Sequence, residues 1–282
     1  MDPIEFHYKI FSYFEKRGWK ALFSPYYIDN YTQKPREIDI IAEKFYKILP
    51  PPFIKVNYND LDLTDQQKYL GTFNVRLYIE CKSKALNDYK LLFEKPICRN
   101  FSVLQRGINM FFSEMELSYD NLHYFKNNVV KLFKRSKKNK RSKNNDYLYD
   151  AINQVLHSMI YFENKFKKDG PNVSLISSEE RNHLEILYIV SFPVIIVENI
   201  NATAIRNKSN FNNEVNNNFV TEGIKNNFVI EVNYCYHDEI NKDFRNKIFY
   251  IDVVSYENIE EFLKNIESSL EEIKKKLFGE FN

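Results

Sequence analysis

The chain has 282 residues, of which 44% are hydrophobic and 16% aromatic, so it can bury a substantial core. Its 40 basic and 38 acidic side chains nearly balance, which excludes a strongly basic or strongly acidic protein. The three cysteines lack Cys-x-x-Cys spacing, and no segment approaches the roughly 18 apolar residues of a membrane span. We therefore expect a cytoplasmic protein without structural zinc and without a membrane partner.

The beginning of the chain predicts a helix followed by strands. Residues 3–17 place apolar side chains at helical spacing, and Asp2 before them and Gly18 after them suit a helix start and end. Apolar segments near 20–27 and 36–43 are typical of strands.

The rest of the chain alternates between the two kinds of element. We expect helices over 99–118, 146–168 and 256–278, and strands over 74–83, 184–197, 228–236 and 247–254. These elements predict an α/β fold with a central mixed sheet flanked by helices.

Three segments interrupt this pattern and are interpreted as insertions into a single domain covering 1–282. Residues 44–73 contain three consecutive prolines and then an acidic stretch. Residues 126–145 hold nine Lys or Arg and no acid, while 199–227 contain eleven Asn and read as a low-complexity loop.

The final helix carries an apolar stripe that steps by four and three residues. Its members are Ile259, Leu263, Ile266, Leu270, Ile273 and Leu277. Such a stripe usually covers a sheet, which is the interpretation we favour. The alternative is the seam of a homodimer, although three heptads are few for a coiled coil.

Charged residues inside two apolar runs are the main functional clue. Asp39 lies between isoleucines, and Glu80 and Lys82 share one face of a predicted strand while Cys81 points to the other. Burying such charges is costly unless they are paired or bind a metal. We predict an Mg²⁺ (or Mn²⁺) site with Asp39 and Glu80 as carboxylate ligands and the Cys81 carbonyl as a further ligand. Lys82 would orient an attacking water or stabilise the transition state.

The order of these features resembles the PD-(D/E)XK nucleases. A helix ending in glycine, a strand with REIDIIA at 36–42 and a strand with IECK at 79–82 are most similar to Mrr-type restriction enzymes and archaeal Holliday-junction resolvases. The resemblance covers residues 3–84. It implies a restriction-endonuclease-like core, catalytic roles for Asp39, Glu80 and Lys82, an Mg²⁺ cofactor, and DNA as the substrate of a restriction or repair endonuclease.

The chain departs from this family pattern on the first helix. Where the family usually has a glutamate, this chain has His7, and Glu5 lies two residues earlier. Residues two apart on a helix point in nearly opposite directions, so only one of them can face the site. His7 has the better orientation and Glu5 the better chemistry, and both remain candidates.

The basic segment is a candidate for contacts with DNA phosphates. The candidate residues are Lys131, Lys134, Arg135, Lys137, Lys138, Lys140, Arg141 and Lys143. A solvated basic loop is the alternative. Gln154, on the 146–168 helix, matches a glutamine often found in similar nucleases, although its spacing is not unique.

Two other interpretations compete with an active nuclease. Glu80 and Lys82 would form an ordinary surface ion pair if their strand lay at a sheet edge, with Asp39 in a turn. Alternatively, the chain is a non-catalytic nucleic-acid-binding or assembly protein on a degenerate nuclease fold.

Overall fold

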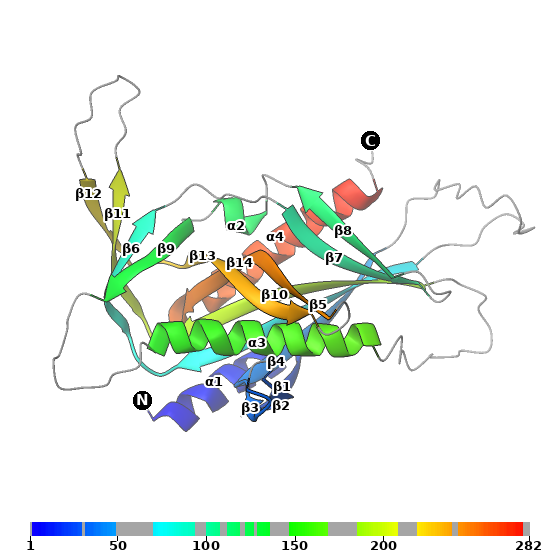
Figure 1. Ribbon diagram of the computed structural model, residues 1–282, viewed down its shortest axis with the longest axis horizontal. Helices are drawn as coiled ribbons and strands as arrows, with labels where there is room; N and C mark the ends of the chain where they lie inside the picture. Colours follow the sequence, from blue (N-terminus) through cyan, green and yellow to red (C-terminus); the bar gives the residue numbers. More distant parts are fainter. Residues whose placement is uncertain are drawn as a thin grey trace, which may run out of the picture.

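The structure is a computed structural model (Figure 1). It describes residues 2–29, 32–48, 70–93, 100–107, 112–118, 122–126, 129–135, 147–168, 185–207, 219–238 and 242–278. The helices are α1 (Pro3–Lys16), α2 (His123–Lys126), α3 (Tyr147–Lys168) and α4 (Ile259–Phe278), with a 3₁₀ turn (Tyr256–Asn258) before α4. The strands are β1 (Lys20–Phe23), β2 (Tyr26–Ile28), β3 (Pro35–Glu37), β4 (Ile40–Ile48), β5 (Leu70–Lys82), β6 (Leu86–Phe93), β7 (Asn100–Gly107), β8 (Phe112–Ser118), β9 (Val129–Arg135), β10 (Glu185–Val197), β11 (Ile200–Asn207), β12 (Phe219–Ile224), β13 (Phe228–Asp238) and β14 (Asp243–Ser255).

A large mixed sheet organises the chain, which confirms the α/β class and the flanking helices. Its described strands run in the order β1-β4-β5-β10-β14-β13-β9-β6-β11-β12, and β7 and β8 extend from one half of β10. Strand β10 is parallel to both β5 and β14, while β4 is antiparallel to β5. Strands β2 and β3 form a separate two-stranded hairpin.

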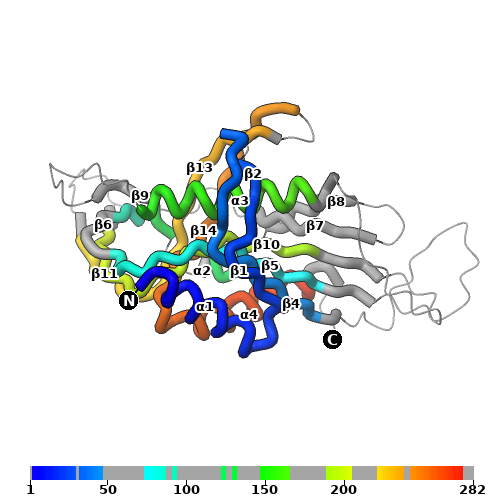
Figure 2. The backbone as a smooth tube through the Cα atoms, turned by 90° about the horizontal axis from the view of Figure 1, so that it is seen from below, coloured from blue at the N-terminus to red at the C-terminus, as the bar shows by residue number. Residues whose placement is uncertain are grey.

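The sheet separates two cores, one on each face. Helices α1 and α4 pack with α2 on one face, and α3 packs on the other (Figure 2). Successive side chains of strand β5 alternate between these two cores. Leu77, Ile79 and Cys81 enter the α1–α4 core, whereas Tyr78 enters the α3 core. Glu80 and Lys82 therefore lie on the α3 face.

Helix α1 confirms the expectation for residues 3–17. The Asp2 carboxylate accepts hydrogen bonds from the backbone N–H groups of Ile4 (2.9 Å) and Glu5 (3.3 Å), as an N-cap residue does. Gly18 follows the helix with a φ of 76°, a conformation that favours glycine.

Most of the other predicted elements are found, but the helix expected over 99–118 is wrong. Residues 100–107 and 112–118 instead form the antiparallel strands β7 and β8, and β7 pairs with the first half of β10. Phe101 and Val103, and then Met115 and Leu117, recur every second residue. This period of two, completed by pairing along β10, outweighs the weak helical pattern.

The three expected insertions contain more regular structure than predicted. Strand β4 continues to residue 48, and strand β5 already begins at residue 70. Strand β9 occupies part of 126–145, and the predicted loop 199–227 contains the hairpin β11–β12. The parts 49–69, 127–128, 136–145 and 208–218 lie outside the described residues.

The apolar stripe of α4 covers the sheet. Ile259, Leu263, Ile266, Leu270 and Ile273 are all buried in the core that α4 shares with α1, while the side chain of Leu277 lies outside the description. Because burial within the chain already occupies these side chains, they are not available as a homodimer seam.

Among the described helices, none is both long and apolar enough to cross a membrane.

Candidate metal centre

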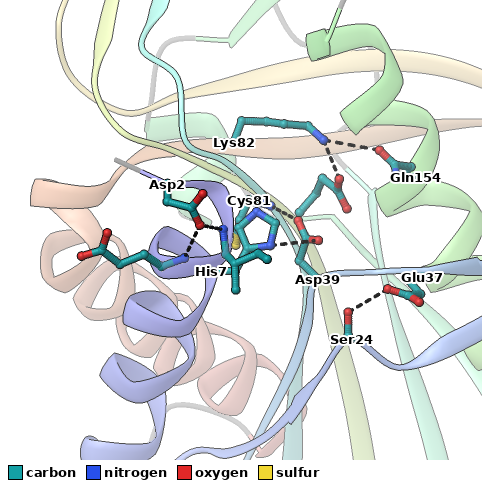
Figure 3. Close-up of polar contacts among 11 residues, drawn as sticks. Asp2, His7, Ser24, Glu37, Asp39, Cys81, Lys82 and Gln154 are labelled. Carbon is teal, nitrogen blue, oxygen red and sulfur yellow. Dashed lines mark hydrogen bonds and ion pairs between the residues drawn. The ribbon is translucent and has the colours of Figure 1, made fainter.

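The three core residues of the predicted site come together at the end of β5. Asp39 and Lys82 lie close to each other in space, with His7 of α1 on one side and Gln154 of α3 on the other (Figure 3). Their elements are the start of β4, the end of β5 and the two helices that cover opposite faces of the sheet.

Asp39 lies in a bend between β3 and β4, which corrects its expected place inside a strand over 36–43. Its Oδ2 accepts a hydrogen bond of 2.7 Å from the backbone N–H of Cys81. Its carbonyl oxygen accepts one of 2.8 Å from the N–H of Ser24, which turns the chain between β1 and β2 with a φ of 50°. The bend thus directs the Asp39 carboxylate across to β5.

Glu80 and Lys82 form the one-sided pair that strand alternation predicts. Lys82 Nζ lies 2.6 Å from Glu80 Oε1 and 3.5 Å from Gln154 Oε1. The Glu80 side chain is only 2% exposed and that of Lys82 is 23% exposed. Because β5 lies between β4 and β10 inside the sheet, this is not a surface ion pair on an edge strand.

The site concentrates negative charge where water is scarce. Burial, and then the charge of Asp39, raise the pKa of the Glu80 carboxyl from 4.5 to about 8, although Lys82 acts in the opposite direction. Burial also raises the pKa of Asp39, while His7, the Cys81 N–H and Lys82 oppose that rise. Two carboxyl groups that disfavour each other's ionisation in this way would be stabilised by a cation.

This electrostatic situation predicts a pH-dependent stability. Because folded Glu80 holds its proton more tightly than the unfolded chain does, the free energy of unfolding falls as pH rises from 4.5 towards 8. Glu80→Gln removes this titration, so its melting temperature in EDTA is expected to fall less over the same interval. Parallel melting profiles of the two proteins, measured by differential scanning fluorimetry, would contradict the raised pKa.

On the first helix, the structure brings His7 to the site and leaves Glu5 away from it. His7 Nδ1 lies 3.4 Å from Asp39 Oδ1, and the two side chains are 22% and 17% exposed. Glu5 is exposed in the first turn of α1, where its backbone N–H is capped by Asp2. His7 is therefore placed to hold the Asp39 carboxylate.

The donor set fits a hard divalent cation with few protein ligands. Glu80 Oε2 is buried and lacks a hydrogen-bond partner among the described residues. Within the same residues, no group of three or more His, Cys, Asp or Glu side chains could enclose a metal ion. Mg²⁺ is commonly bound through one or two carboxylates, with waters and substrate phosphates completing its shell. Asp39 and Glu80 would supply such a pair.

Sequence patterns did not identify the residues through which α3 and the β2–β3 hairpin contact each other beside the site. His157 Nδ1 lies 2.9 Å from Asp29 Oδ2, which joins α3 to the β2–β3 hairpin leading into Asp39. Tyr27 is buried near Asp29 and Glu80, and the charges of these two carboxylates add to burial in raising the pKa of the Tyr27 hydroxyl. The pairing of Asp29 with His157 spans 128 positions, so no local spacing could have revealed it.

The predicted basic segment is described only in part. Lys131 lies in β9 with its Nζ 3.8 Å from the buried carboxylate of Glu231. Lys134 and Arg135 belong to the same strand. Lys137, Lys138, Lys140, Arg141 and Lys143 lie outside the described residues.

A second polar cluster resembles a hydrolase triad in composition but not in accessibility. His123 Nδ1 lies 3.0 Å from Ser269 Oγ, and its Nε2 lies 3.1 Å from Asp252 Oδ2. The three residues are 3%, 1% and 2% exposed. Since Ser269 Oγ also donates to the Asn265 carbonyl, this cluster ties α2, α4 and β14 together and offers no nucleophile to a substrate.

Comparisons with protein-family models, with curated proteins and with solved structures found no match to this chain.

Proposed function

We propose that the protein is a metal-dependent DNA endonuclease that hydrolyses phosphodiester bonds at the Asp39–Glu80–Lys82 site. The observation that carries the proposal is a buried glutamate with an unpartnered oxygen, held beside a second carboxylate and a lysine. Burying two neighbouring carboxylates is costly unless a cation offsets their charge, and groups with such a raised pKa cluster at functional sites. The resemblance of residues 3–84 to the PD-(D/E)XK pattern adds to this argument.

Each side chain has a role that its contacts suggest. Asp39 and Glu80 would hold Mg²⁺ or Mn²⁺, with the Cys81 carbonyl as a further ligand. The ion would supply charge neutralisation at the phosphate and acidify a water molecule. Lys82 would orient the attacking water, and Gln154 would keep the lysine on the α3 face. His7 would fix the orientation of the Asp39 carboxylate.

The proposal is tested by incubating the protein with supercoiled plasmid in Mg²⁺, in Mn²⁺ and in EDTA. Conversion to open-circular and linear DNA is expected with either metal and not in EDTA. Binding of the plasmid without cleavage under all three conditions would instead identify a non-catalytic nucleic-acid-binding protein. Equal cleavage in EDTA would exclude the metal.

A further inference from the structure

The end of the β13–β14 hairpin carries aromatic and basic side chains on one face. In the antiparallel register, Tyr234 lies opposite Lys247 and Tyr236 lies opposite Arg245. Residues directly opposite each other share a face, so all four side chains lie on one side of the hairpin. We call these four residues the hairpin face.

The hairpin face lies on the same side of the sheet as α3 and the candidate metal centre. Tyr234 and Tyr236 pack against the core beneath α3, as Phe249 does. The rings of both tyrosines meet Phe249 edge to face, with centroids 6.3 and 6.2 Å away. These contacts fix the orientation of two half-buried rings on this side of the sheet.

Positive charge accompanies the rings. Arg245 is exposed and Lys247 is partly exposed, with its Nζ 5.9 Å from the centre of the Phe249 ring. Two acidic residues lie on the same face at the tip of the hairpin: Asp243, the first residue of β14, whose carboxylate accepts from the N–H of Phe244, and Asp238, which pairs with it in the register. Arg36, 47% exposed, adds a further cation from the neighbouring β2–β3 hairpin.

One residue of α3 connects this surface to the candidate site. The ring of His157 lies 5.7 Å from that of Tyr234, and its Nδ1 contacts Asp29 of the β2–β3 hairpin, which also contacts Arg36. In Figure 2, the two hairpins extend past α3 on the same side. Gln154, which contacts Lys82, lies one helical turn before His157. The surface therefore continues along α3 to Lys82.

We propose that the hairpin face binds a single-stranded nucleic acid and leads it along α3 to the Asp39–Glu80–Lys82 site. Aromatic side chains stack on unpaired bases, while neighbouring cations contact the phosphates between them. Bases in a duplex are already stacked on each other, so the rings favour unpaired nucleotides. The inference rests on the proposed nuclease only in treating the bound strand as an unpaired segment of the nuclease's DNA substrate.

Binding is tested with the full chain in EDTA, so that cleavage plays no part. Fluorescence anisotropy would follow labelled single-stranded DNA, RNA of the same sequence and duplex DNA, each about 20 nucleotides long to exceed common site sizes. The combined variant Arg245→Ala and Lys247→Ala is expected to weaken single-strand binding about tenfold. It should also reduce the salt dependence by about 1.4 in log–log slope, since each lost phosphate contact removes about 0.7.

A matched control removes two lysines from the opposite side of the sheet. Lys264→Ala with Lys275→Ala on α4 takes away equal charge from side chains that are 72% and 54% exposed, and should leave binding unchanged. Tyr236→Leu keeps an apolar side chain and is expected to weaken single-strand binding about fivefold, with little effect on duplex. Where this variant fails to fold, Arg245→Glu tests the same face from an exposed position.

Several results would overturn the proposal: no binding of either single strand by the parent, equal losses in the hairpin and control variants, or an unchanged affinity in the hairpin variant. If the combined variant Arg245→Ala and Lys247→Ala weakens binding but Tyr236→Leu does not, the hairpin face is a general contact for polyanions and the stacking role is wrong. Comparing the DNA and RNA arms identifies which nucleic acid is bound. Single-strand binding without metal-dependent cleavage would refute the nuclease and leave this inference standing.

Discussion

Replacing Glu80 by glutamine or Asp39 by asparagine is expected to reduce metal-dependent DNA cleavage by more than about a hundredfold. Changes to residues that merely support metal ligands already cost about 10- to 100-fold, and these two would be the ligands themselves. Glutamine is a fair replacement because the Glu80 carboxyl, whose pKa is raised to about 8, is largely protonated at neutral pH without metal. The variant should therefore fold as the parent does.

The controls separate ligand loss from a general effect of removing a charge. Glu261→Gln, on the exposed side of α4, is the matched amide substitution and should cleave at the parental rate. His7→Ala, which removes a contact to Asp39 and no ligand, is expected to cost about 10- to 100-fold. Parental cleavage by both Glu80→Gln and Asp39→Asn would show that the reaction occurs elsewhere.

The geometry of Glu80 and Lys82 was predictable because strand alternation is a strong local rule. Two residues separated by one position on a strand must share a face, and the sheet on both sides of β5 then buries them. The same local reasoning identified α1, from its Asp2 cap and the glycine after it, and α4, from its stripe. In each case, neighbouring residues carry the information.

The parts that could not be predicted depend on contacts between distant segments. Strands β7 and β11 are defined by pairing with β10 and β6. Asp39 was expected inside a strand, but it lies in a bend between β3 and β4, opposite the turn at Ser24 that separates β1 from β2. The contact between Asp29 and His157 likewise exists only once α3 packs on the sheet. No single-segment pattern encodes these contacts.

A buried ionic network positions the same elements that carry the candidate site. Arg76 of β5 is 2% exposed and forms ion pairs with Glu43 of β4 and with Glu163 of α3, the latter at 3.4 Å. Glu163 Oε1 also accepts hydrogen bonds from Tyr78 Oη (3.0 Å) and Ser191 Oγ (2.6 Å). Arg76 and Tyr78 lie on the face of β5 that also carries Glu80, so the network fixes α3 above that face.

Arg76→Met is expected to lower the free energy of unfolding by about 3–5 kcal/mol, the usual cost of removing one partner from a buried ion pair. The loss arises mainly because two carboxylates, 20% and 15% exposed, would keep their charges without the guanidinium. Urea unfolding at neutral pH, compared with the parent, measures this cost.

A combined variant identifies the source of that cost. Adding Glu43→Gln and Glu163→Gln to Arg76→Met removes the uncompensated charges and should restore a large part of the lost stability. If Arg76→Met costs less than about 1 kcal/mol, the network behaves like an exposed ion pair and does not fix α3. If the amide substitutions bring no recovery, the lost packing of the Arg76 side chain, and not its charge, holds β4, β5 and α3 together.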